Sequence, residues 1–497
     1  MKLDEYARED ALGLAALVAR GDVSAAELAR VAARAIAAVN GEVNAVVETY
    51  DDRIQALDES TLGSGPFRGV PFLMKDVYGH EGGRRIEFGS RLCKGMVAAQ
   101  DSAYCTLVKA AGVNIIGRSA APEYSMAGTT EGALYGNTST PWRKGFSAGG
   151  SSGGAVAAVV SGMVPMAQGT DIAGSIRIPA SFCGGVGLKP SRGRISFAPL
   201  LDENGYGLAQ NFVQTKSVRD AAAMLDCLAV PQPGDPFLIP RPALAYAELA
   251  RRDAPRLRIG WSTSALLGLA PDPEVAAAVQ RTAHLLASMG HHVEEADPAP
   301  LGLATLNSMM DVWFFGFDLR LAGYAQRTGL AIGPDTLEPM TWKICQHARQ
   351  MKPAQFVSAM ATLNTVRRQL GAYFTQHDIW LGPTTAHVAE PWGRYNLGRD
   401  DVGIDDLAEQ LLRPTVQYTL PHNIMGTPAI SLPLAVHTSG QHAGLPIGVQ
   451  LAAAPAQEHL LLQLAAALEV ALPWAGRVPP LHVSHHEGQA YPGSVQT

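Results

Sequence analysis

Hydrophobic and polar positions follow two rhythms along the chain, one helical and one strand-like. Apolar positions at helical spacing predict helices over residues 24–39, 155–163, 219–228, 272–289 and 456–472. Short apolar runs bounded by turn residues predict strands over residues 113–116, 164–167, 257–261 and 292–294. Because strands that alternate with helices favour a parallel or mixed sheet covered on both faces, we expect an α/β fold.

Residues suited to helix ends support some of these boundaries. Ser24, followed three residues later by Glu27, has the pattern of a capping box. We expect Asp101 to cap the following helix and Gly112 to end it. From His482 onward the chain is polar, and we expect a short mobile tail there.

Two glycine-rich loops, each containing serine, lie within residues 145–194. The first spans residues 149–154 around Ser151, and the second spans residues 169–175 and ends on Ser175. Flexible linkers lack long apolar runs, whereas the chain between these loops is rich in Ala and Val. We therefore expect packed elements to hold both loops, so that main-chain N–H groups gather beside a hydroxyl.

This segment resembles the amidase signature family, serine hydrolases with a Ser-Ser-Lys triad in place of Ser-His-Asp. The resemblance extends upstream to GVPFLMKD at residues 69–76 and downstream to NIMGTPA at 423–429 and GLPIGVQL at 444–451. It implies a large twisted mixed β-sheet covered by helices on both faces, with a helical layer over the substrate. Residues 191–196, 219–220 and 471–474 look closest to the 6-aminohexanoate-cyclic-dimer hydrolases, which open cyclic amides.

The family motif also implies roles for individual residues. Lys75 matches the catalytic base, Ser151 the bridging serine and Ser175 the nucleophile. A cis peptide is implied between Gly150 and Ser151. The implied oxyanion hole consists of the main-chain N–H groups of Ile172, Ala173, Gly174 and Ser175.

Lys75 can act as a base only if it is neutral. A free lysine titrates near a pKa of about 10.4, so burial has to lower the pKa of Lys75 substantially. The apolar residues of 70–74 provide such a setting, and Asp76, next along a strand, points to the opposite face. Ser175 would then attack an amide carbonyl while Ser151 passes its proton to Lys75.

Other polar residues near the two loops are expected to support them. We expect Asp171 to pair with Arg177, since a buried charge needs a partner. Ser152 and Thr170 are expected to steady the relay by hydrogen bonds. A structural role is expected for Cys183, Lys189 and Arg194.

The expected substrate contacts come from two segments. In the family fold, residues 123–130 approach the acyl group of the substrate, and residues 309–317 are crowded with Met and aromatic side chains. This aromatic set favours a helical core stripe over a substrate wall. We expect the substrate contacts to be Met126, Ala127, Gly128 and Phe317. They favour an amide with an apolar or aromatic body, such as a cyclic oligoamide, a lactam or an anilide.

Length and composition predict one large domain over residues 1–497, which the resemblance implies is a single amidase domain. The parts that the resemblance implies are a signature core at about 66–200, a variable helical cover at about 300–413, and closing strands and a helix at about 414–481. With 47% hydrophobic and 17% charged residues, the composition is typical of a compact enzyme with an ample core.

Charge and residue spacing exclude several classes of protein. A net charge of −6 disfavours direct nucleic-acid binding, and no apolar run is long enough to predict a membrane span. The N-terminus has no apolar signal region, and the five Cys are scattered, so we expect a cytoplasmic protein with free thiols. The 14 His lack metal-ligand spacing. We expect a small-molecule amide substrate, no metal, no cofactor, and a monomer or homodimer.

Three alternatives compete with this interpretation. Residues 149–153 also match the G-x-S-x-G nucleophile elbow of α/β-hydrolases, but residues 141–146 before them are polar and turn-prone instead of a buried strand. A phosphate-binding loop is disfavoured because no Gly-Lys-Ser/Thr closes the glycine run. The third is the A subunit of a glutamyl-tRNA amidotransferase, which shares the fold but works in a complex. Aryl acylamidases and general amidases remain open as well.

Overall fold

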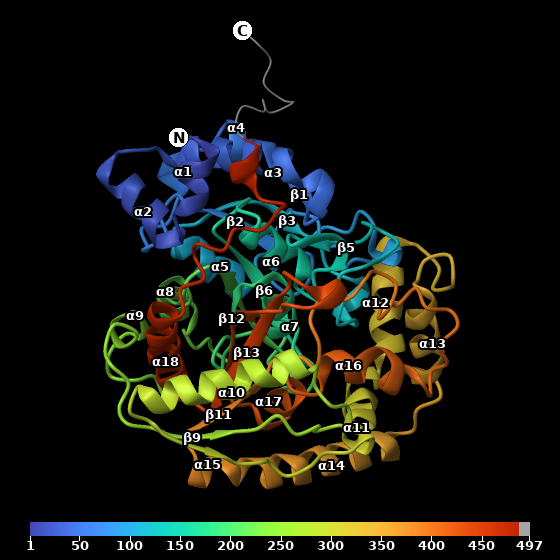
Figure 1. The fold of residues 1–497 in the computed structure, drawn as a ribbon. Helices are drawn as coiled ribbons and strands as arrows, with labels where there is room; N and C mark the ends of the chain where they lie inside the picture. Colours follow the sequence, from blue (N-terminus) through green and yellow to red (C-terminus); the bar gives the residue numbers. More distant parts are fainter. Residues whose placement is uncertain (487–497) are drawn as a thin grey trace.

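A computed structural model describes residues 1–486, and its largest element is an 11-stranded sheet at the centre of the molecule (Figure 1). In order across the sheet, the strands are β1 (Val46–Thr49), β3 (Asn114–Ser119), β2 (Pro71–Lys75), β6 (Met166–Asp171), β8 (Gln210–Thr215), β7 (Val186–Lys189), β12 (Ala429–Val436), β13 (Pro446–Ala453), β11 (Ile379–Pro383), β9 (Arg258–Trp261) and β10 (His292–Glu295).

Parallel and antiparallel pairs both occur, so the predicted mixed sheet is confirmed. β2 runs parallel to its neighbours β3 and β6, and β9 runs parallel to β10 and β11. β8 is antiparallel to both β6 and β7, and β13 is antiparallel to both β12 and β11. Every residue of β2, β6 and β8 is buried, as expected for strands covered on both faces.

Helices flank this sheet on both faces (Figure 1). The first four helices, α1 to α4, lie together at the top of Figure 1, near the N-terminus of the chain. The helices are α1 (Leu3–Arg8), α2 (Ala11–Arg20), α3 (Ala25–Val43), α4 (Asp51–Gln55), α5 (Ala103–Ala110), α6 (Gly153–Val160), α7 (Arg177–Cys183), α8 (Val218–Leu228), α9 (Tyr246–Leu249), α10 (Pro273–Ser288), α11 (Leu303–Phe314), α12 (Phe317–Thr328), α13 (Pro339–Ala348), α14 (Pro353–Gly371), α15 (Tyr373–Gln376), α16 (Arg413–Val416), α17 (Leu420–Met425) and α18 (Glu458–Ala471).

The segment predicted as a helical cover contains α11 to α15, which lie at the right and lower edge of Figure 1. α11 packs against α14, and α12 packs against α13. The single domain and its division into core, cover and closing parts stay predictions. Within residues 1–486, no helix is both long enough and apolar enough to cross a membrane.

The predicted caps had different outcomes. Ser24 does cap α3, because its Oγ accepts the N–H of Glu27 over 3.0 Å. The predicted cap of α5 is wrong: Ser102, and not Asp101, accepts the N–H of Cys105. The Asp101 carboxylate instead accepts from Lys109 on α5 and from the N–H of Gly82, and the pattern around a helix start reveals neither partner.

Two segments differ from the prediction: β6 is longer than expected, and the start of the expected mobile tail is packed against the protein. β6 runs on to Asp171, because buried polar residues in it find partners: Gln168 Oε1 accepts the N–H of Lys75 over 2.8 Å. The segment after Leu481 begins packed, with His482 and Val483 buried and the N–H of Val483 bonded to the carbonyl of Ser161. The rest of the predicted tail, residues 487–497, lies outside the described residues.

The segment before the first glycine-rich loop is a strand, contrary to the predicted turn. β5 (Arg143–Ser147) pairs with β4 (Ser139–Thr140) in a separate two-stranded sheet. Most of β5 is only partly buried. The buried strand of the main sheet that a nucleophile elbow needs is therefore not at this position.

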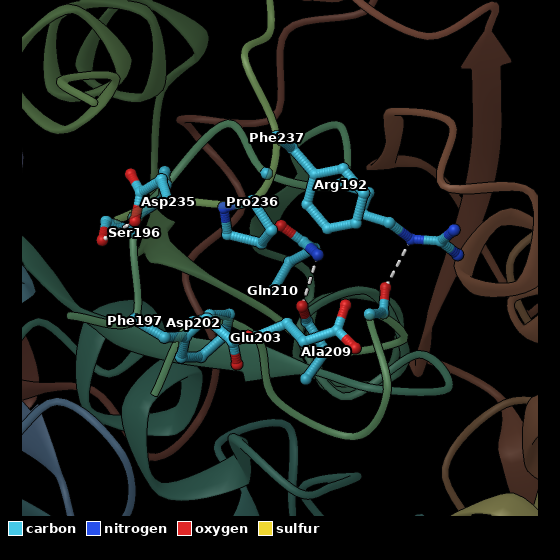
Figure 2. A pocket seen from close by; sticks show the side chains of 13 residues that line it. Arg192, Ser196, Phe197, Asp202, Glu203, Ala209, Gln210, Asp235, Pro236 and Phe237 are labelled. Atoms are coloured by element: carbon cyan, nitrogen blue, oxygen red, sulfur yellow. Dashed lines mark hydrogen bonds between the residues drawn. The ribbon is translucent and has the colours of Figure 1, made fainter. Parts of the chain in front are cut away.

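The connection from β7 to β8 forms one wall of a pocket, called here the side pocket (Figure 2). Its walls come from residues 192–210 and from Asp235, Pro236 and Phe237. Within it, Gln210 Nε2 donates to the carbonyl of Ala209, and Arg192 donates to the carbonyl of Gly207.

Candidate active site

Neighbouring strand ends bring the predicted residues together. β2 ends on Lys75 and β6 ends on Asp171, and these two strands are parallel neighbours. Their carboxyl ends therefore meet at one edge of the sheet, where parallel α/β sheets place their ligands. α6 begins directly after Ser152, and α7 begins two residues after Ser175.

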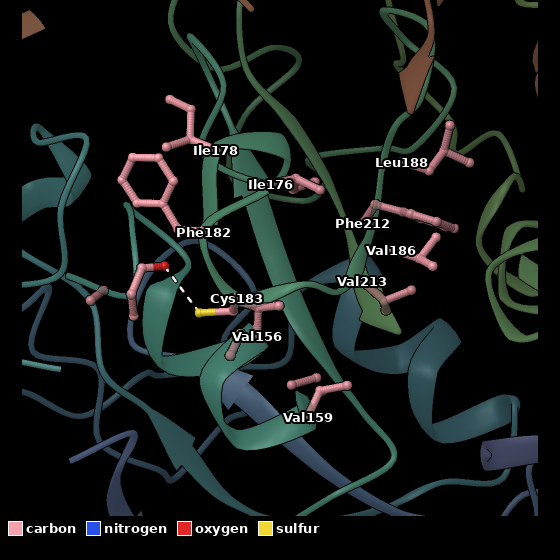
Figure 3. Close-up of a cluster of buried hydrophobic side chains, with 14 of the residues drawn as sticks. Val156, Val159, Ile176, Ile178, Phe182, Cys183, Val186, Leu188, Phe212 and Val213 are labelled. Atoms are coloured by element: carbon pink, nitrogen blue, oxygen red, sulfur yellow. Dashed lines mark hydrogen bonds between the residues drawn. The ribbon is translucent and has the colours of Figure 1, made fainter. Parts of the chain in front are cut away.

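A buried apolar cluster beneath the two serine loops fixes these helices (Figure 3). It combines Val156 and Val159 of α6 with Phe182 of α7 and Phe212 of β8, all with no exposed surface. Cys183 belongs to this cluster, where its thiol donates to the carbonyl of Ala148 over 3.4 Å. Burial raises the pKa of the Cys183 thiol to about 12, so the thiol stays protonated and serves packing.

Lys75 is surrounded by three hydroxyl groups. Its Nζ lies 2.7 Å from Ser151 Oγ, 2.8 Å from Thr170 Oγ1 and 3.0 Å from Ser152 Oγ. Only 1% of Lys75 is exposed. Burial lowers the pKa of Lys75 well below its ordinary value, although the negative charge of Asp171 opposes this shift.

The two serine loops are tied to each other by the main chain. The N–H of Ser152 donates to the carbonyl of Ser175 over 3.2 Å. Thr130 supports the first loop, because its Oγ1 donates to the carbonyl of Gly149 and accepts the N–H of Gly153. The peptide bond between Gly150 and Ser151 is cis.

A fully buried ion pair holds the second loop. Both carboxylate oxygens of Asp171 accept from Arg177, over 3.0 and 2.9 Å, which confirms the predicted pair. Asn423 Nδ2 donates to the same carboxylate, and its Oδ1 accepts from Arg177. Burial alone would raise the pKa of Asp171, but the charge and hydrogen bonds of Arg177 lower it to about 2.

Main-chain N–H groups of this loop have different partners. Those of Gly174 and Ile176 donate to the Asp171 carboxylate, over 2.8 and 3.1 Å. The N–H groups of Ile172, Ala173 and Ser175 have no acceptor among the described residues. Of the four N–H groups expected for an oxyanion hole, that of Gly174 is thus bonded to Asp171, and those of Ile172, Ala173 and Ser175 are available.

Ser151 and Ser175 line one narrow cavity, called here the inner pocket. Its wall consists of Tyr78, Tyr124, Ser125, Ser151, Thr170, Asp171, Ile172, Ser175, Asn204, Ala209, Asn211 and Trp313. Tyr78 and Asn204 also line an outer cleft of about 520 Å³, formed by residues 201–206 and the side of α12. The shared residues place the outer cleft next to the inner pocket.

Comparisons with known proteins agree with this geometry. A family model described as Amidase matches residues 27–462. The chain belongs to the amidase family. The 6-aminohexanoate-cyclic-dimer hydrolase of Paenarthrobacter ureafaciens is 37% identical to it over 493 residues, covering 95% of this chain and 97% of that protein. The acylamidase of Rhodococcus erythropolis is 32% identical over 476 residues, covering 94% and 96%.

The solved structures lead to the same family. The structure of a 6-aminohexanoate cyclic dimer hydrolase complexed with substrate superposes with a TM-score of 0.89 at 35% identity, covering 96% of this chain and 99% of that chain. Glutamyl-tRNA(Gln) amidotransferase A subunits are related more distantly. The predicted family and fold are confirmed, and the chain is an enzyme of a family whose members here are named amidases and amide hydrolases.

The predicted substrate contacts lie outside the wall of the inner pocket in this amidase. Met126, Ala127 and Phe317 are buried, and Phe317 packs edge-on against Tyr124 with ring centroids 5.5 Å apart. Gly128 lies against Thr415, whose Oγ1 would be 2.4 Å from an added Cβ. Phe317 thus packs behind the wall through Tyr124, and the role of all four residues as substrate contacts stays a prediction.

Sequence reasoning missed other residues of the wall. Tyr124 and Ser125 belong to residues 123–130, which were expected to approach the acyl group, so the sequence did indicate that this segment lies near the pocket. Trp313 belongs to the aromatic set for which the sequence favours a core stripe, and it lines the inner pocket. Asn204 and Asn211 had no signal, because they reach the pocket through the connection and register of β8, which no local motif encodes.

Proposed function

We propose that this enzyme hydrolyses a carboxylic amide through an acyl-enzyme on Ser175, with Ser151 as the proton relay and Lys75 as the base. The observation that carries the proposal is the 2.7 Å contact between Lys75 Nζ and Ser151 Oγ, beside a pocket that Ser175 also lines. Burial favours the neutral amine that a base must be.

The hydroxyl groups around Lys75 favour proton transfer from Ser151 to the Lys75 amine. Ser152 Oγ lies 3.2 Å from the carbonyl of Thr170 and donates to it, so toward Lys75 this oxygen can only accept. A neutral amine has two protons to donate and one lone pair. Ser151 can therefore donate its hydroxyl proton to Nζ and accept a proton from Ser175 in return.

The reaction then follows in two halves. Ser175 Oγ bonds to the carbonyl carbon, and its proton moves through Ser151 to Lys75. The C–N bond breaks as Lys75 returns that proton through Ser151 to the leaving nitrogen. Water attacks the acyl-enzyme by the same relay, releasing the acid and restoring Ser175.

The developing oxyanion would be held by the N–H groups of Ile172, Ala173 and Ser175. They face no protein acceptor in the described part of the chain, whereas the N–H of Gly174 is held by Asp171. One such donor contributes about 3 kcal/mol to the transition state. Gly174, expected as a fourth donor, would instead fix the shape of the loop.

The substrate is proposed to have an apolar or aromatic body, as in a cyclic oligoamide, a lactam or an anilide. Tyr78, Tyr124, Ile172 and Trp313 line the inner pocket, and Phe317 packs behind Tyr124. Aromatic and aliphatic side chains beside specifically placed polar groups are typical of pockets that bind small molecules. The relatives named for hydrolysis of a cyclic amide dimer and of acylamides support this class.

Hydrolysis rates on three amides test the proposal. The purified chain is given a cyclic diamide, an anilide and acetamide, with Ser175→Ala as the control. We expect kcat/KM to be higher for the first two than for acetamide, and Ser175→Ala to be inactive on all three. A preference for acetamide would overturn the substrate class.

The same purified chain distinguishes a hydrolase from an amidotransferase A subunit. An A subunit would need partner subunits, whereas we propose a chain that is active alone. Activity of the purified single chain on amides favours the hydrolase. The monomer or homodimer state, the cytoplasmic location, and the lack of a nucleic-acid partner stay predictions.

A further inference from the structure

Asn211 is a buried polar residue of the inner pocket for which the proposed mechanism has no use. It lies on β8 directly opposite Thr170 of β6, whose hydroxyl contacts Lys75. Only 1% of Asn211 is exposed, and neither Oδ1 nor Nδ2 has a hydrogen-bond partner within the described residues. Buried polar groups are normally paired, so this carboxamide indicates a group that enters the pocket.

Other carboxamides on the same strand are at least partly paired. Gln210 Nε2 donates to the carbonyl of Ala209, and Gln214 Nε2 donates to the carbonyl of Ile176 over 2.8 Å. Both acceptors are carbonyls outside β8, so buried amides on this strand can find main-chain partners nearby. Asn211 differs from both because its donor and its acceptor are both unused.

Ser125 adds a second polar group of the same kind. Its Oγ is buried without a partner in the part of the chain that the structure describes, and it lines the inner pocket with Asn211 and Ser175. Ser125 and Asn211 come from segments far apart in the sequence. Two independent elements therefore place unpaired polar atoms at one cavity.

The chemistry of the wall restricts what these groups can recognise. Among the residues lining the inner pocket, none is Lys, Arg or His, so an anionic group would find no counter-charge on the wall. Asp171 is already paired with Arg177. A carboxamide offers one donor group and one acceptor, which is the complement of another amide.

We propose that Asn211, assisted by Ser125, determines specificity by binding a second amide group of the substrate. The inference rests on the proposed function, since one amide has to lie at Ser175 while the other reaches Asn211. It names the substrate class more narrowly: diamides are preferred over monoamides of similar size and shape.

The variant Asn211→Leu tests this with two matched substrates, a cyclic diamide and a lactam of equal ring size with one amide. Leucine keeps the branched four-atom skeleton of the side chain and removes both polar atoms. We expect kcat/KM for the diamide to fall about 10- to 100-fold, mainly through KM, and that for the lactam to change by less than about threefold.

A control variant lies on the neighbouring residue. Gln210→Leu removes a buried carboxamide from the same strand, but one that lines the side pocket of Figure 2 instead of the inner pocket. We expect it to leave the ratio of the two kcat/KM values unchanged. If Asn211→Leu does not fold, as judged by circular dichroism, Asn211→Asp replaces it and should lose the diamide preference while keeping a similar shape.

Two results would overturn the inference: an equal loss on both substrates, or an unchanged rate on the diamide. Both leave the proposed function intact, because the wild-type enzyme still hydrolyses the lactam and Ser175→Ala does not. Wild-type levels of hydrolysis by Ser175→Ala would instead overturn the proposed function.

Discussion

Arg177 donates to both carboxylate oxygens of Asp171, and neither side chain has any exposed surface. This pairing matters for Lys75, which lies at the end of the neighbouring strand and feels the charge of Asp171. As long as Arg177 neutralises Asp171, burial dominates the environment of the lysine and favours its neutral form.

Removing the guanidinium should affect both stability and activity. We expect Arg177→Met to lower the free energy of unfolding by about 3–5 kcal/mol, because it leaves a buried carboxylate without its partner. The uncompensated Asp171 should also raise the pKa of Lys75 and move activity to higher pH. Urea unfolding and a pH–rate profile measure these two effects.

Arg194→Met is the matched control for that variant. It breaks another buried pair, between Arg194 and Glu458, which does not line the inner pocket. We expect a comparable loss of stability without a shift of the pH profile. An equal shift in both variants would contradict the link between Arg177 and Lys75.

The pH dependence of kcat/KM should report Lys75 directly. Burial lowers its pKa in the folded enzyme, and only the neutral amine accepts a proton. Activity is therefore expected to rise with pH through this lowered pKa and then level off. For stability, the unfolded chain binds more protons between the folded pKa and the ordinary value of 10.5, so Lys75 should make stability rise with pH over that window.

A second buried lysine provides the comparison. Lys189 is fully buried, its pKa is also lowered by burial, and its Nζ donates to the carbonyl of Pro190. We expect Lys75→Met to remove the rising limb of activity together with turnover, and Lys189→Met to keep the limb. If the rising limb of the pH profile is lost in Lys189→Met and kept in Lys75→Met, the base is assigned to the wrong residue.

Thr170 should support catalysis by positioning the amine. Thr170→Val keeps the shape of the side chain and removes the oxygen 2.8 Å from Lys75 Nζ. Losing a buried hydrogen-bond partner costs about 1–3 kcal/mol, so we expect kcat to fall about 5- to 150-fold with KM nearly unchanged. Steady-state kinetics measure the split, and a change confined to KM would contradict a positioning role.

Gly174 should tolerate no side chain. Its φ is +136°, and an added Cβ would lie 2.2 Å from Thr419 Oγ1 and 2.6 Å from Ile178 Cδ1. We expect Gly174→Ala to displace the loop that carries Ser175 and to abolish turnover, as measured by amide hydrolysis. Gly329→Ala, at another positive φ but with open space around it, should keep activity.

The sequence predicted the elements and residues that depend on local patterns. The apolar runs located four strands of the main sheet, β3, β6, β9 and β10. The two serine loops with Lys75 could be identified because each adjoins a buried strand or helix. The polar end of β6 was missed, since Gln168 and Thr170 are buried only because distant residues pair with them.

The wall of the inner pocket was harder to predict for a related reason. Asn211 reaches it through the antiparallel register of β8 with β6, which follows a long connection from β7. Phe317, expected as a substrate contact, packs edge-on against Tyr124, which lines the inner pocket. Tertiary packing determines which side chains line the inner pocket, and no local sequence motif encodes this.

The central claim is that Ser175, and not Ser151, forms the acyl-enzyme. Reaction with a fluorophosphonate probe, followed by mass mapping of the labelled peptides, tests it most directly. The account predicts a single adduct on Ser175 in the wild-type enzyme, strongly reduced in Lys75→Met. An adduct on Ser151, or inactivation without any adduct on Ser175, would contradict it.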